Sequence, residues 1–127
     1  MTAQEAIALL KQLIAIPSFS KKEDKTADVL EDFLKERGCP INRAGNNVWV
    51  QNDHYDTQKP TVLLNSHHDT VKPNSGYTKD PFSSQVEDGK LYGLGSNDAG
   101  GPLVSLIATF LHFKSATDLK FNIILAA

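Results

Sequence analysis

Two stretches near the beginning of the chain carry apolar side chains at helical spacing. In residues 3–15 the apolar stripe consists of Ala6, Ile7, Leu10, Leu13 and Ile14. In residues 23–37 it consists of Ala27, Leu30, Phe33 and Leu34. Pro17 and Gly38 follow these stretches. The residue before a proline leaves the helical region, and glycine accepts the left-handed geometry that often closes a helix. The pattern therefore predicts two amphipathic helices, each with one face available to a sheet.

Short apolar runs predict the strands of that sheet, at residues 47–51, 61–66 and 121–127. The second of these runs has a continuous apolar centre, Val62–Leu64, which is typical of a strand that is buried on both faces. Asp88 and Gly89 stand between two strand-like flanks and predict a hairpin over residues 84–93.

A further helix is predicted between the strands at 61–66 and 121–127. Residues 102–114 begin with Pro102, which suits the first turn of a helix, and their apolar stripe consists of Leu103, Leu106, Ile107 and Phe110. A strand, a crossover helix and a second strand form a βαβ unit, in which the two strands run parallel. We therefore predict an α/β fold with three α/β/α layers, a mixed, largely parallel sheet and helices on both of its faces.

Composition narrows the function classes. The 127 residues are 40% hydrophobic, and 13 Lys+Arg against 15 Asp+Glu give a net charge of −2, which fits one globular domain without the basic surface of a nucleic-acid binder. The single cysteine, Cys39, excludes a disulfide framework and a cysteine-rich zinc site. No apolar run approaches the roughly 20 residues that span a bilayer, and the first residues lack the basic region of a signal peptide. We therefore expect a cytoplasmic domain that binds neither nucleic acid nor a membrane.

The first candidate for chemistry follows the strand at 61–66. Ligand sites of open α/β sheets lie at the carboxyl ends of the strands, and His67, His68 and Asp69 occupy that position. Because side chains alternate along an extended chain, His67 and Asp69 point the same way and His68 points the opposite way. His67 and Asp69 can serve one metal ion, either as two ligands or as a ligand and the carboxylate that orients it. The alternative is a set of polar loop residues without a ligand.

The second candidate is Asp98, which lies in a glycine-rich segment before the helix at 102–114. Gly93 and Gly95 do not complete a dinucleotide fingerprint because position 98 is aspartate, and no Gly-Lys-Ser/Thr follows to cradle a phosphate. The glycines instead suit a backbone that passes closely around a site while presenting a carboxylate. The alternative is that Asp98 only caps the helix that follows.

Taken together, His67, Asp69 and Asp98 predict a metal site. Imidazole and carboxylate ligands without a thiolate suit catalytic zinc or a similar divalent ion. Two such ions bridged by a carboxylate form a common hydrolytic centre.

Four motifs give the sequence a resemblance to a known family. They are Ile16-Pro17-Ser18, Ser66-His67-His68-Asp69-Thr70-Val71, Asp80-Pro81-Phe82, and the run from Asp88 to Gly95 that leads into Asp98. With these motifs the sequence resembles the zinc-dependent M20 family of peptidases and amidohydrolases. That family includes acetylornithine deacetylase, succinyl-diaminopimelate desuccinylase, aminoacylases and glutamate carboxypeptidases. Within the family the last two motifs look most like acetylornithine deacetylases.

The resemblance implies a role for each candidate residue. His67 matches the ligand of one zinc ion, Asp69 the catalytic aspartate that orients the histidine side of the site, and Asp98 the carboxylate that bridges both metals. The implied cofactor is a pair of zinc ions, with cobalt as the alternative. The implied activity is removal of the acyl group from a small N-acyl amino acid, N-acetylornithine in arginine biosynthesis, by a protein that forms a homodimer at full length.

Two departures from the family pattern limit what residues 1–127 can do. The segment Asp98-Ala99-Gly100-Gly101 lacks the lysine that commonly follows the bridging position, and the paired glutamates expected after the strand at 121–127 are not present. Since the chain also stops on an apolar strand, we expect it to be the N-terminal part of a catalytic domain, inactive alone, without the rest of that domain and the lid domain. The alternatives are a di- or tripeptidase or a succinyl-diaminopimelate desuccinylase of the same family, and a non-catalytic fragment.

Overall fold

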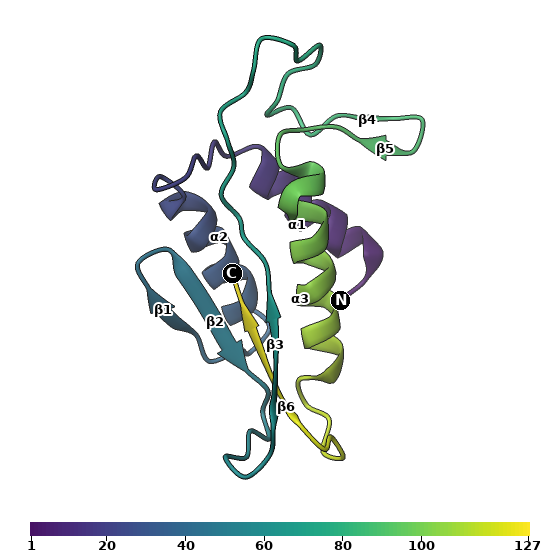
Figure 1. Ribbon diagram of the computed structural model, residues 1–127. Helices are drawn as coiled ribbons and strands as arrows, with labels where there is room; N and C mark the ends of the chain where they lie inside the picture. The colour runs from purple at the N-terminus through teal and green to yellow at the C-terminus, as the bar shows by residue number, and fades with distance from the viewer.

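The computed structural model describes residues 1–127 as three helices packed on a four-stranded sheet, with a small separate hairpin (Figure 1). The helices are α1 (Ala3–Ile14), α2 (Asp24–Lys35) and α3 (Gly101–Phe113). The sheet contains β1 (Asn42–Ala44), β2 (Asn47–Gln51), β3 (Thr61–Asn65) and β6 (Asn122–Ala126), and the hairpin contains β4 (Val86–Glu87) and β5 (Lys90–Leu91). A kinked turn, η1 (Ser96–Gly100), leads directly into α3.

The three predicted helices are confirmed, with their ends shifted by one or two residues. At the start of α1 the Thr2 hydroxyl accepts a hydrogen bond from the Glu5 main chain, and the Glu5 carboxylate accepts one from the Thr2 main chain. This capping box satisfies two N–H groups that a helix leaves open at its first turn. None of the helices is long and apolar enough to cross a membrane.

The sheet has the order β1-β2-β6-β3, so the strand that comes last in the chain lies in its interior. β3 and β6 are parallel, as predicted for a βαβ unit with α3 as its helix, whereas β6 pairs antiparallel with β2 and β2 pairs antiparallel with β1. The α/β class with a mixed sheet is confirmed. Among these strands only the β3–β6 pairing is parallel.

One hydrophobic core lies between the helices and a single face of the sheet. Val48 and Val50 of β2 and Ile123 and Leu125 of β6 point to this face, and the buried side chains of all three helices belong to the same cluster. In Figure 1 α2 lies behind the strands of the sheet, and α3 lies beside β3. The chain therefore contributes one helical layer and the sheet of the predicted three-layer arrangement.

The opposite face of the sheet carries no helix. Trp49 and Ile124 are half-buried there, and Leu63 is 59% exposed. Val62 belongs, like Leu63, to the edge strand β3. It points to the core side of the sheet and is 42% exposed. The prediction that strand 61–66 is buried on both faces is thus wrong for the described residues, because β3 pairs on one side only and has one uncovered face.

Candidate metal centre

The candidate residues meet where two segments leave the fold at the same end. β3 ends at Asn65, and the chain continues in extended form through His67 and Asp69. The second segment is η1, which carries Asp98 immediately before α3. The carboxyl end of a parallel strand and the start of its crossover helix thus form the site, as expected for an open α/β sheet.

His67 stands between two carboxylates. Its Nε2 atom lies 3.0 Å from Oδ1 of Asp98, and its Nδ1 atom lies 3.0 Å from Oδ1 of Asp69. Nδ1 is also 3.1 Å from the main-chain oxygen of Asp69. The structure therefore brings together all three residues that the sequence singled out, although Asp98 is far from the other two along the chain.

The charges of this cluster favour a protonated imidazole in the absence of a metal. Burial acts to lower the pKa of His67, but the hydrogen bonds and charges of Asp98 and Asp69 outweigh it and raise the pKa above its ordinary value. The hydrogen bond from Ser20 holds the pKa of the Asp69 carboxyl below its ordinary value, and the charge of His67 adds to this effect. A cation bound between His67 and Asp98 would occupy the place of the Nε2 proton.

These residues fit part of a zinc site. Two ligand atoms at about 2.0–2.1 Å from a tetrahedral zinc lie roughly 3.3 Å apart, close to the 3.0 Å between Nε2 of His67 and Oδ1 of Asp98. The Asp98 side chain is 89% exposed, so its second oxygen faces away from the protein. No group of three or more His, Cys, Asp or Glu side chains surrounds a common point in residues 1–127, so a complete coordination sphere would need further ligands.

The backbone around Asp98 is set by glycines. Asp98 and Ala99 are not helical, and the peptide bond between them is cis. Gly95 has a φ of +77° and accepts a hydrogen bond of 2.8 Å from the Gly100 main chain, which closes the turn. The first residue of α3 is preceded by Gly100 with no side-chain cap. The alternative in which Asp98 merely caps the helix is therefore wrong, because its carboxylate faces His67.

We expect Gly95→Ala to weaken metal binding. A Cβ atom at Gly95 would lie 2.7 Å from Cγ2 of Thr70, next to Asp69, and the positive φ would add strain of about 1–3 kcal/mol. Gly38→Ala is the matched control, because Gly38 has a φ of +69° but a Cβ there meets nothing within 4 Å. Isothermal titration with zinc should show weaker binding only for the Gly95 variant. Equal zinc affinity in the two variants would contradict this role of Gly95.

His68 points away from His67 and Asp69, as the alternation predicts. Its Nδ1 atom lies 2.8 Å from the Thr26 hydroxyl of α2, and its Nε2 atom donates to the Asn46 carbonyl at 3.1 Å. Burial lowers the pKa of His68. Since both ring nitrogens are engaged within the protein, His68 anchors the end of β3 to α2 and is not arranged as a ligand.

Two serines that hold this loop from the other side were not among the predicted site residues. Ser18 and Ser20 follow Pro17, and their hydroxyl groups donate to the His68 carbonyl and to Oδ2 of Asp69, respectively. The signal available in the sequence was the serine at every second position after a helix end, which is the spacing of one face of an extended segment.

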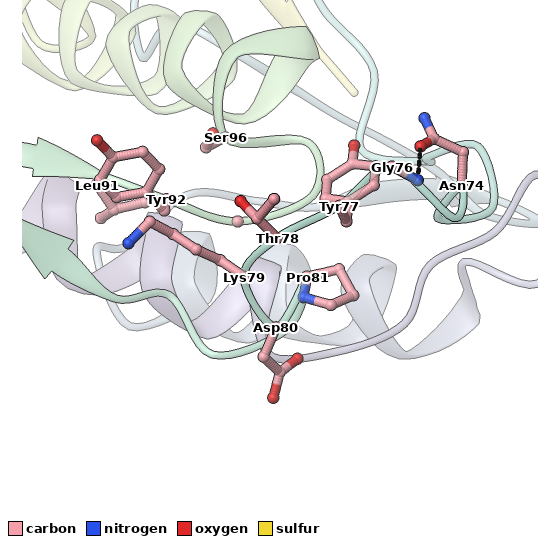
Figure 2. A pocket seen from close by; sticks show the side chains of 11 residues that line it. Asn74, Gly76, Tyr77, Thr78, Lys79, Asp80, Pro81, Leu91, Tyr92 and Ser96 are labelled. Atoms are coloured by element: carbon pink, nitrogen blue, oxygen red, sulfur yellow. Dashed lines mark hydrogen bonds between the residues drawn. The ribbon is translucent and has the colours of Figure 1, made fainter.

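A cavity of about 410 Å³ adjoins the candidate metal centre (Figure 2). Tyr77, Gly93 and Ser96 line both this cavity and the smaller hollow of about 360 Å³ that contains His67 and Asp98. In the larger cavity, the Lys79 ammonium lies 4.5 Å from the centre of the Tyr92 ring and 2.5 Å from Glu87. The neighbouring space thus offers an aromatic wall and a cation whose charge is balanced by a carboxylate.

The chain is similar to proteins of known name. The chain is 33% identical to a succinyl-diaminopimelate desuccinylase of Corynebacterium glutamicum over 126 residues, covering 97% of the chain and 32% of that protein. It is 31% identical to the enzyme of the same name from Rickettsia bellii, covering 90% of the chain and 31% of that protein. The chain therefore spans about a third of the length of these relatives.

Solved structures share the fold. The M20 family metallo-carboxypeptidase Sso-CP2 of Sulfolobus solfataricus superposes with a TM-score of 0.76 at 22% identity, over 96% of this chain and 30% of that one. Human carnosine dipeptidase 1 gives a TM-score of 0.75 at 23% identity, over 97% and 31%.

The family model described as peptidase family M20/M25/M40 matches residues 63–127, the half of the chain that contains His67, Asp69 and Asp98. With this match, the predicted resemblance is confirmed, and the chain belongs to peptidase family M20/M25/M40.

Proposed function

We propose that the protein is a zinc-dependent amidohydrolase that removes the acyl group from a small N-acyl amino acid. Residues 1–127 would form the N-terminal part of its catalytic domain. The observation that carries this proposal is the contact between Nε2 of His67 and Oδ1 of Asp98, at the sheet edge where α/β enzymes bind their ligands. Membership of a hydrolase family and the names of the relatives support the same reaction class.

Each of the three residues has a distinct role in this proposal. His67 would hold one zinc ion, and Asp98 would be the carboxylate that serves both ions. Asp69 accepts the hydrogen bond from Nδ1 of His67, which would leave Nε2 free to act as the metal ligand. Bound zinc supplies Lewis acidity toward the amide carbonyl and a hydrolytic nucleophile at neutral pH. The general base and the remaining ligands would come from residues other than these.

For the acyl group, we propose succinyl rather than acetyl. The similar relatives are succinyl-diaminopimelate desuccinylases, which favours the desuccinylase alternative over the prediction of N-acetylornithine. A succinyl group carries a free carboxylate that an acetyl group lacks. A site that binds this carboxylate with polar partners leaves them unpaired when the acyl group is acetyl, so discrimination is expected to be strong.

A comparison of kcat/KM values tests this proposal. N-succinyl-diaminopimelate, N-succinylornithine, N-acetylornithine and an unblocked dipeptide would be assayed with the zinc-loaded full-length protein. We expect both succinyl substrates to exceed N-acetylornithine by at least about tenfold, a difference of about 1.4 kcal/mol in transition-state binding. A preference for N-acetylornithine would restore the deacetylase assignment, and a preference for the dipeptide would indicate a peptidase.

A further inference from the structure

We propose that Ser20 is a positioning residue of the metal centre, whose hydroxyl group fixes the Asp69 carboxylate in the orientation that directs His67 toward the metal. This inference rests on the proposed function, since it concerns the same site. It adds a residue outside the matched half of the chain to the machinery of that site.

The main chain places Ser20 beside Asp69. α1 ends at Ile14, and beyond Pro17 the residue Phe19 forms a parallel bridge with Thr70. The Thr70 main chain donates to the Ser18 carbonyl at 2.8 Å, and the Ser20 main chain donates to the Thr70 carbonyl at 3.2 Å. These two bonds hold Ser20 next to the metal-site loop independently of its side chain.

The Ser20 hydroxyl then completes the hydrogen bonding of the carboxylate. It donates to Oδ2 of Asp69, while Oδ1 faces Nδ1 of His67 at 3.0 Å. The terminal torsion of an aspartate side chain is broad and easily rotated. With a partner on each oxygen, the carboxylate plane is fixed, and through it the plane of the imidazole ring.

Ser18 and Ser20 differ in exposure, and this difference separates a role in positioning Asp69 from a role in the stability of the fold. Ser18 is 3% exposed and its hydroxyl donates to a main-chain carbonyl, so its loss would leave a buried acceptor without a partner. Ser20 is exposed. Water can take the place of its hydroxyl group, so loss of this group should change the free energy of unfolding little. Removal of the Ser20 hydroxyl should therefore affect the orientation of Asp69 and not the stability of the fold.

The experiment compares four variants of the full-length protein. Ser20→Ala removes the hydroxyl, Ser20→Thr retains it, and Asp69→Asn serves as the reference for loss of orientation. Ser115→Ala is the matched control, because Ser115 also donates to an aspartate, Asp53 at 2.5 Å, but at the far end of α3. Zinc dissociation constants would be measured by competition with a chelator, together with kcat, KM and the thermal unfolding midpoint.

We expect Ser20→Ala to weaken zinc binding by about tenfold and to lower kcat with an unchanged KM and unfolding midpoint, since loss of a group that orients a ligand typically costs about 10–100-fold. Ser20→Thr should restore both values, and Ser115→Ala should match the wild type. Zinc binding by Ser20→Ala equal to wild type, with Asp69→Asn impaired, would overturn the role of Ser20 and leave the proposed function intact. Wild-type protein that binds no zinc would overturn both.

Discussion

Asp98→Ala is expected to remove zinc from the protein and to reduce kcat/KM by about a thousandfold or more. Asp98 supplies the only carboxylate oxygen near Nε2 of His67, and stabilisation by a bound metal is worth several kcal/mol in the transition state, where each 1.36 kcal/mol is a factor of ten in rate. The measurement is the zinc-to-protein ratio by elemental analysis, with kcat/KM on the preferred N-acyl amino acid. His67→Ala should give the same result.

One further variant tests whether zinc binding depends on the charge or on the shape of the Asp98 side chain. A second variant serves as the control. Asp98→Asn keeps the size of the side chain and removes its charge, so it should also lose zinc. Asp118→Ala removes one exposed carboxylate from the connection after α3, away from the site, and should retain zinc and activity. An unchanged zinc-to-protein ratio in Asp98→Ala would exclude Asp98 as a ligand and, with it, the proposed centre.

The largest effect on stability is expected for Phe110→Ala, at about 3–5 kcal/mol of the free energy of unfolding. Phe110 is fully buried, on the face of α3 that packs in the single core of the chain. Alanine would leave a cavity that the sheet and the other helices fill only in part. The measurement is urea unfolding followed by circular dichroism.

Phe113→Ala is the control on the same helix. Phe113 is 40% exposed and its ring contacts His112 edge-on, with ring centres 4.6 Å apart. We expect this variant to lower the free energy of unfolding much less than Phe110→Ala does. Similar losses in the two variants would mean that burial on α3 does not determine the stability of the fold.

The helices and the βαβ unit could be predicted because their signals are local. Leu10, Leu30 and Phe110 repeat at helical spacing with their neighbours, and each lies in the core. β1 could not be predicted in this way, since its three residues, Asn42–Ala44, show no apolar alternation. It forms because a turn at Gly45, with a φ of +61°, returns the chain to pair with β2.

The exposure of β3 was not predictable from its own residues. The apolar run Val62–Leu64 indicates what a strand can bury, whereas its actual burial depends on which elements pack against each face. The same limit applies to the proposed metal centre. Sequence spacing indicated that His67 and Asp69 share a side, but the hydrogen bond from Ser20 depends on a contact between distant segments.

The position of β6 in the sheet has a consequence for how the protein folds during synthesis. Residues 122–126 lie between β2 and β3, both of which precede them by many residues, and β2 and β3 do not pair with each other. Contacts of such large sequence separation slow folding because a long loop must close before they form. We therefore expect the hairpin of β1 and β2 and the strand β3 to leave the ribosome without pairing with each other. The sheet should then assemble in one late step, once residues 122–126 have emerged.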